Sequence, residues 1–120
     1  MKAILLSIVA SIALLPASSL AHTHLLRSIP VENAVLEKSP PVATLVFAEP
    51  VTLTAVKIES NEVGKTAVKP MPAKPAAELS VALPTLPLGR YTMSWRAISD
   101  DGHIMSGEIH FTIGEKGGRQ

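Results

Sequence analysis

Runs in which apolar and polar residues alternate make up most of the chain after its first two dozen residues. Every second side chain of such a run faces the same side of a β-strand. Alternating or β-branched runs of this kind occupy residues 24–30, 43–47, 51–58, 79–83, 91–96 and 107–113. The pattern therefore predicts six or seven short strands, and no segment has a convincing helical period.

Proline and glycine mark where these strands end. Glu49-Pro50 is expected to end the first core strand, and residues 61–64 and 100–102 are typical of turns. Residues 69–77 contain three prolines, which excludes a central strand and favours a loop or an edge. Short strands at this spacing predict one all-β domain, an antiparallel β-sandwich or a small barrel.

Residues 1–21 interrupt this pattern and have the form of a secretory signal peptide. Lys2 supplies a positive charge, Ala3 to Leu15 is an apolar run of 13 residues, and small residues follow up to Ala21. The run falls short of the roughly 20 residues that a membrane span requires. We therefore expect cleavage after Ala21. The mature domain, 22–120, is then expected to be periplasmic, with no membrane span.

Composition and charge exclude several classes of function. The chain has no cysteine, which excludes disulfides, cysteine-ligated zinc and thiol nucleophiles. Its 11 basic and 10 acidic residues nearly cancel, and the balance reaches zero once Lys2 is removed. A nucleic-acid-binding protein normally carries a clear basic excess, so we expect no such partner. Four histidines stand out in a chain with one tryptophan.

Cleavage after Ala21 would create the first candidate metal ligand. His22 would become the N-terminal residue and would offer its α-amine and its imidazole Nδ1 to one metal ion, which closes a chelate ring. His24 lies two residues further along. The competing interpretation is that two histidines lie near a chain end by chance.

Asp101-Gly102-His103 is the second candidate. In an extended segment, residues two apart face the same side, so a carboxylate and an imidazole would point together. Asp-Gly is also an ordinary hairpin turn, and that interpretation is favoured when this motif is taken alone. Two clusters of nitrogen and oxygen donors suit Cu(II), and Zn(II) is the natural competitor for them.

The sequence from His22 onward resembles the CopC family of periplasmic copper-binding proteins. The resemblance is carried by the N-terminal HTHLLRSIPVENAVL, by LVFAEPV, by LPLGRYTMSWRAISDDGH and by SGEIHFTI. It implies a Greek-key β-sandwich, immunoglobulin-like or cupredoxin-like, that binds one Cu(II) in copper resistance and homeostasis. It also implies His22, Asp101 and His103 as copper ligands, with His24 as either a further ligand or a neighbour.

The methionines and the remaining histidine, His110, are not expected to form further metal sites. Soft thioethers select Cu(I), but the proline-rich loop holds only Met71, so we expect no separate Cu(I) site. Met93 alternates with core residues, and Met105 is expected in the core although it lies close to His103. His110 falls on the outward face of the last strand and is expected to face solvent without binding metal. Glu49 is interpreted either as a turn residue or as a neighbour of the metal site.

Three functions remain in competition. The leading one is a monomeric, non-enzymatic Cu(II) carrier whose partner, by resemblance, is the inner-membrane protein CopD or another copper-resistance component. A second is a histidine-brace copper oxidase of the polysaccharide monooxygenase type, although a chain with only 3% aromatic residues offers little for a sugar-binding face. A third is an immunoglobulin-like adhesion or chaperone module in which the histidines have no role.

Overall fold

The computed structural model describes residues 25–114, which form a seven-stranded β-sheet. The strands are β1 (Leu25–Ile29), β2 (Ala34–Leu36), β3 (Val42–Ser60), β4 (Gly64–Ala67), β5 (Ala76–Ala82), β6 (Gly89–Ser99) and β7 (Ile104–Ile113). This confirms the expected all-β fold of about seven strands. No helix among the described residues is long and apolar enough to cross a membrane. The expected signal peptide, 1–21, lies outside the described residues.

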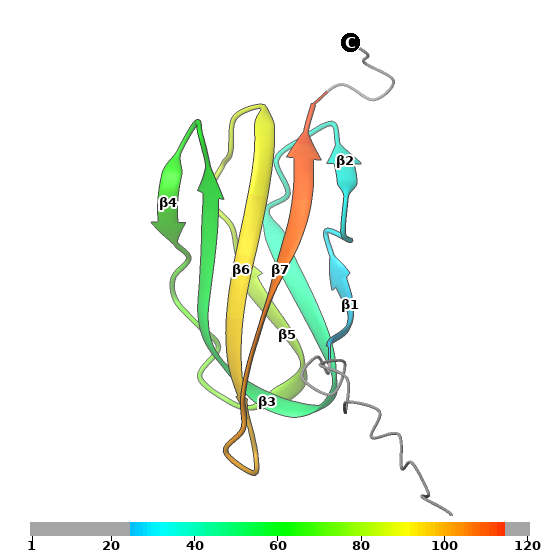
Figure 1. The fold of residues 1–120 in the computed structure, drawn as a ribbon, viewed down its shortest axis with the longest axis vertical. Helices are drawn as coiled ribbons and strands as arrows, with labels where there is room; N and C mark the ends of the chain where they lie inside the picture. The colour runs from blue at the N-terminus through cyan, green and yellow to red at the C-terminus, as the bar shows by residue number, and fades with distance from the viewer. Residues whose placement is uncertain (1–24, 115–120) are drawn as a thin grey trace, which may run out of the picture.

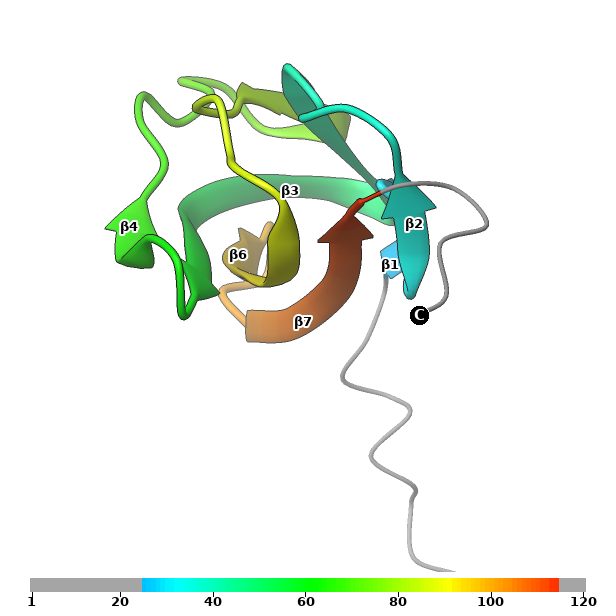
Figure 2. The ribbon, with the colours of Figure 1, turned by 90° about the horizontal axis from the view of Figure 1, so that it is seen from above.

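The sheet is organised around β3, the longest strand. Its strand order is β1-β3-β6-β7-β2, and β4 and β5 both pair with β3 as well. All neighbours are antiparallel except β2, which runs parallel to β7. Figure 1 shows the long β6–β7 hairpin beside β3, and Figure 2 shows how the sheet curls, which brings β1 and β2 to the same side. The curl encloses one apolar interior.

The expectation that Glu49-Pro50 ends a strand is wrong, because β3 continues through both residues. Up to Phe47 the strand pairs with β1, and from Val51 it pairs with β6. The register with β5 also jumps between Val46 and Val51. Proline cannot donate to a ladder, and Pro50 lies where β3 changes partners and no donor is required. The strand therefore bends at Pro50 without ending there.

The core is built from the alternating positions that the sequence predicts. These inward side chains are at most 9% exposed, and they include Ala43, Leu45, Phe47, Leu79, Val81, Leu83, Tyr91, Met93, Trp95, Ile109, Phe111 and Ile113. Phe47 and Trp95 meet edge to face with ring centroids 5.2 Å apart, and Tyr91 stacks on Phe111 at 5.5 Å. Aromatic contacts of this kind add to burial and join the two halves of the curled sheet.

Two short strands, β2 and β4, were not predicted. Neither shows the alternating apolar pattern, since β2 has three residues and β4 has the sequence Gly-Lys-Thr-Ala. The proline-rich segment is a loop up to residue 75, as expected, and β5 begins at Ala76. The predicted turn at 61–64 is present, and Gly64 adopts a φ of 66° there. Both additional strands extend the edges of the sheet.

Candidate metal centre

A tight turn between β6 and β7 holds both described candidate ligands. The N–H of Gly102 donates to the carbonyl of Ser99 at 2.9 Å, and the N–H of Ser99 donates to the carbonyl of His103, also at 2.9 Å. Gly102 has a φ of 85°, which glycine adopts without the strain that a Cβ would bring. The reversal places Asp101 and His103 on either side of Gly102, at the end of the hairpin.

Asp101 and His103 are in direct contact. Asp101 Oδ2 lies 2.9 Å from His103 Nδ1, and the two side chains are 65% and 80% exposed. The hydroxyl of Ser99 donates to Asp101 Oδ1, and the backbone N–H of His103 also points to that oxygen, at 3.5 Å. The sequence placed the two side chains together only for an extended segment and otherwise favoured a hairpin turn; the structure has the turn, and the two side chains meet across it. In the structure, the turn and Ser99 together hold the carboxylate in place.

These contacts favour the ionised form of Asp101. The hydrogen bond from the Ser99 hydroxyl, helped by the backbone N–H and the charge of His103, lowers the pKa of the Asp101 carboxyl below its ordinary value. An ionised carboxylate accepts hydrogen bonds and binds cations, so Asp101 is in the form that a metal requires.

A small pocket of about 120 Å³ adjoins this pair, lined by Glu49, Val51, Ser99, Asp101, His103 and Met105. The strand register explains the grouping, because Val51 pairs with Ser99 and Ala97 pairs with Met105. Met105 is 5% exposed and packs in the core, as the sequence predicts. Glu49 was left undecided by the sequence. Because β3 continues past Phe47, Glu49 becomes part of the pocket lining, which alternation alone could not reveal.

The other two candidate ligands, His22 and His24, lie outside the described residues. The described chain begins at Leu25, which pairs with Phe47 of β3, two residues before Glu49. Figure 1 shows the start of β1 and the β6–β7 turn at the same end of the molecule.

Within residues 25–114, no group of three or more His, Cys, Asp or Glu side chains is arranged to hold a metal ion. Asp101 and His103 thus supply two donors, and a complete centre needs more from outside this range or from solvent. Met71, the one methionine of the proline-rich loop, is partly buried against the core. The expectation that no separate Cu(I) site exists stays a prediction.

His110 is half-exposed on the outer face of β7, as expected, but it is not isolated. Its Nδ1 lies 2.9 Å from Glu32 Oε2, and its backbone N–H donates to Glu32 Oε1 at 2.8 Å. Glu32 is 78 positions away in sequence. Only the parallel pairing of β2 with β7 brings it close, and that pairing was not predicted.

Comparison with known proteins identifies the family. A model of the CopC domain matches residues 25–114, the whole of the described region. Copper resistance protein C of Xanthomonas campestris pv. juglandis is 34% identical over 112 residues, which cover 84% of this chain and 87% of that protein. Copper transport protein CutJ of Bacillus subtilis is 33% identical over 112 residues, 87% of this chain, but the match spans only 20% of CutJ.

The solved structures agree with this assignment. The crystal structure of CopC from Methylosinus trichosporium OB3b superposes with a TM-score of 0.62 and 26% identity, and it covers 77% of this chain and 93% of that one. The shared fold extends over nearly the whole of that protein. The chain therefore belongs to the CopC family of copper-binding proteins, which are not enzymes.

Proposed function

We propose that this protein binds one Cu(II) ion in the periplasm and sequesters or delivers it for copper resistance. The ligands are His22, through its α-amine and imidazole, with Asp101 and His103. One observation carries this proposal: the Asp101–His103 pair, with 2.9 Å between donor atoms, lies at the end where the chain enters β1. Whether His24 is a further ligand or a neighbour is part of the test.

The separation of the pair matches a copper site. Two ligands bound at about 2.0–2.1 Å and at a right angle to one another lie about 2.9 Å apart. Oδ2 of Asp101 and Nδ1 of His103 are at this separation already, so a metal ion can replace the proton that they share. Nitrogen and oxygen donors in a square arrangement select Cu(II) over softer or larger ions.

The N-terminal segment completes the set because of its reach. An amine and an imidazole from one residue form a chelate, and the α-amine has a reference pKa of about 7.7–8.0, so copper displaces its proton near neutral pH. Glu49, at the mouth of the same pocket, supplies a second carboxylate facing the site. We assign it to accept a hydrogen bond from the N-terminal amine or from a copper-bound water.

Exposure of the centre supports delivery as well as storage. Both described ligands are more than half exposed, so an incoming donor can replace them one at a time. A segment similar to this chain occurs within the longer copper transport protein CutJ. This supports an inner-membrane copper transporter of the CopD type, or another copper-resistance protein, as the partner.

One extra residue tests the site. We would compare the chain that begins at His22 with a chain carrying a single glycine before His22, which turns the amine into an amide. We expect Cu(II) affinity to fall by about 100-fold or more, because the chelate ring is lost. Competition with a chromophoric chelator measures the affinity, and fluorescence of Trp95 provides an independent signal.

A matched control separates the amine from the mere length of the chain. Adding a glycine after Gln120 lengthens the chain equally and should leave the affinity unchanged. Equal copper binding by all three forms would contradict the ligand set. A glycine-extended form that binds about 100-fold more weakly, and whose d–d absorption also moves to longer wavelength, would support it.

A further inference from the structure

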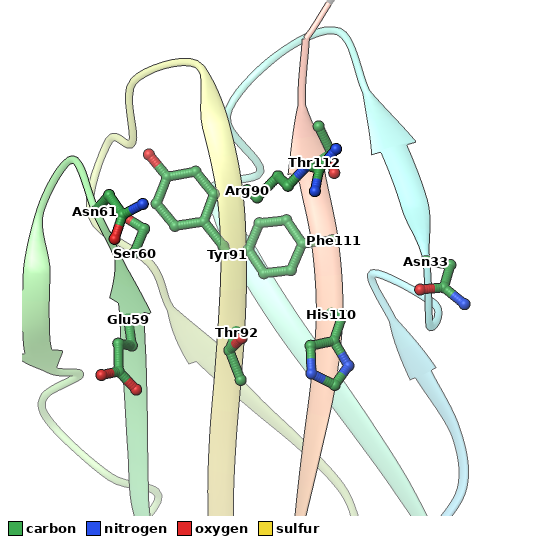
Figure 3. A pocket seen from close by; sticks show the side chains of 10 residues that line it. All are labelled: Asn33, Glu59, Ser60, Asn61, Arg90, Tyr91, Thr92, His110, Phe111 and Thr112. Atoms are coloured by element: carbon green, nitrogen blue, oxygen red, sulfur yellow. The ribbon is translucent and has the colours of Figure 1, made fainter.

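The outer face of the β6–β7 hairpin carries a second histidine with carboxylates beside it, His110 with Glu32 and Glu108, away from the turn. A cavity of about 670 Å³ lies here, and its lining includes Glu59, Thr92 and His110. Glu59, Thr92 and His110 form one row across β3, β6 and β7, since Glu59 pairs with Thr92 and Thr92 pairs with His110. Figure 3 shows the imidazole of His110 projecting beside the row.

Glu32 fixes the orientation of this imidazole. Its Oε1 accepts the backbone N–H of His110 at 2.8 Å, and its Oε2 lies 2.9 Å from His110 Nδ1. The backbone N–H of Asn33 donates to the carbonyl of His110 at 2.6 Å, which fastens the same segment. An ionised carboxylate only accepts hydrogen bonds, so in the neutral imidazole Nδ1 carries the proton and Nε2 keeps its lone pair.

The free nitrogen faces a second carboxylate. His110 Nε2 lies 3.9 Å from Oε1 of Glu108, two residues earlier on the same face of β7. The His110 and Glu108 side chains are 49% and 61% exposed, so both reach solvent. Neighbouring ligands of one ion lie roughly 3 Å apart, so the two atoms would have to approach each other by about 1 Å, and the exposed Glu108 side chain has solvent around it in which to move.

We propose that His110 Nε2 and the carboxylate of Glu108 form a second, weaker Cu(II) site, completed by water. Glu32 is a positioning residue here: it holds the opposite ring nitrogen, as carboxylates do behind many metal-binding histidines. It is not a third ligand, because it lies on the Nδ1 side of the ring. Two side-chain donors without a chelating amine bind more weakly than the set proposed at the turn. Zn(II) competes for the same donors, below Cu(II) in affinity.

The proposed site at His110 is too far from the turn to share a metal ion with His103. His103 and His110 are separated by seven positions along β7, which corresponds to roughly 20 Å of strand. One ion cannot bridge them, so this proposal does not rest on the ligand set at the turn.

Paramagnetic broadening of amide NMR signals tests the proposal directly. We would use the chain with a glycine before His22 and with His103→Gln, which weakens the turn site, and add Cu(II) in small steps. Signals of residues 108–112 and 32–33 should broaden first. His110→Gln should abolish this broadening, and Glu108→Gln should require about 10-fold more copper for the same effect. Glu59→Gln, a carboxylate lining the same cavity, is the matched control and should change nothing.

Two outcomes would overturn the second site. One is that residues 108–112 stay sharp with several equivalents of Cu(II), and the other is that their broadening survives His110→Gln in a chain whose remaining spectrum is unchanged. The role of Glu32 has its own readout, since ¹⁵N shifts of the His110 ring report the tautomer. Glu32→Gln should mix the two tautomers and weaken copper binding. A single Nδ1–H tautomer in that variant would remove Glu32 from the proposal.

Discussion

His103 and His110 lie on the same hairpin and have similar immediate surroundings. Each imidazole has a carboxylate oxygen 2.9 Å from its Nδ1. The side chain of His103 is 80% exposed and that of His110 is 49% exposed. The carboxylate partners differ. Asp101 is two residues from His103 within a turn, whereas Glu32 reaches His110 from the other end of the domain's sequence.

The comparison shows that local chemistry alone does not define a metal site. A histidine beside a carboxylate occurs twice here, but only His103 lies at the β6–β7 turn, at the end of the molecule where β1 begins. His103 is therefore the histidine proposed to share a copper ion with His22. His110 instead joins the segment before β2 to β7. In our proposals, the N-terminal residue His22 is what makes the centre at the turn the tighter one, and the carboxylate of Glu108 completes the side-chain donors of the weaker one.

The largest effect on Cu(II) affinity is expected when His103 and His110 are replaced by glutamine one at a time. His103→Gln should lower the affinity for the first Cu(II) by about 100-fold or more, because a ligand is lost. His110→Gln should leave that first affinity unchanged and remove only later, weaker binding. Titration of the chain beginning at His22 against a competing chelator measures both. Equal losses in the two variants would mean that the centres are not distinct.

Gly107 lies between His103 and His110 in the sequence, and its packing against Trp95 can be used to test how rigid the hairpin is. A Cβ at Gly107 would lie 2.7–2.8 Å from the indole of Trp95, which is 2% exposed and also packed against Phe47. Gly107→Ala should therefore lower the free energy of unfolding by about 2 kcal/mol. The midpoint of thermal unfolding, followed by Trp95 fluorescence, should fall by roughly 10 °C.

The control for this substitution is Gly114→Ala. A Cβ at Gly114 meets only Thr112, at an ordinary distance of 3.9 Å, so this change should be near neutral. The copper stoichiometry of folded Gly107→Ala should remain normal, since neither histidine moves. An unfolding midpoint equal to that of Gly114→Ala would show that the Trp95 ring shifts easily and that the hairpin is softer than its packing indicates.

Alternation was enough to predict most of the core, because residues such as Leu45, Met93 and Phe111 are buried on one face of a strand and the period of two records this directly. The continuity of β3 was missed at Pro50, since a change of strand partners leaves no trace in local sequence. The parallel β2 was missed for a similar reason: its contacts with β7 are long-range, and its three residues are all apolar, so the sequence does not show which of them faces inward.

At the candidate site too, local features were predictable from the sequence and features that depend on the fold were not. The Asp-Gly pair predicted a hairpin turn, which is present, and the side chains of Asp101 and His103 meet across that turn and not along an extended segment. Glu49 and Ser99 line the pocket beside this pair because of the path of β3 and the register of the hairpin, which one sequence taken alone does not specify. His22 and His24 depend on processing, and their roles stay predictions.

A smaller effect on copper binding is expected when Ser99 is replaced. Its hydroxyl supports Asp101 at the turn, so the change should affect that site and not the one at His110. Ser99→Ala removes the hydroxyl that donates to Asp101 Oδ1, so the pKa of the Asp101 carboxyl should rise towards its ordinary value. Copper affinity should fall by about 10-fold, through looser positioning of the carboxylate. Carboxyl ¹³C titration by NMR measures the pKa, and Ser106→Ala, on the outer face of the same hairpin, is the control. An unchanged pKa would remove Ser99 from the site.

The smallest effect concerns acid stability at Glu32. The backbone N–H and the ring of His110 lower the pKa of the Glu32 carboxyl below its ordinary value of 4.5. A carboxylate with a depressed pKa stabilises the fold above its unfolded pKa, and this contribution is lost as pH falls through the folded value. At pH 7 the wild type should therefore have a slightly higher midpoint of thermal unfolding than Glu32→Gln. This difference in midpoint should disappear when the pH is lowered below 4.5. A difference between wild type and Glu32→Gln that grows towards low pH would have the wrong sign, and would mean that the Glu32–His110 contact does not hold β2 to β7 in the way its geometry indicates.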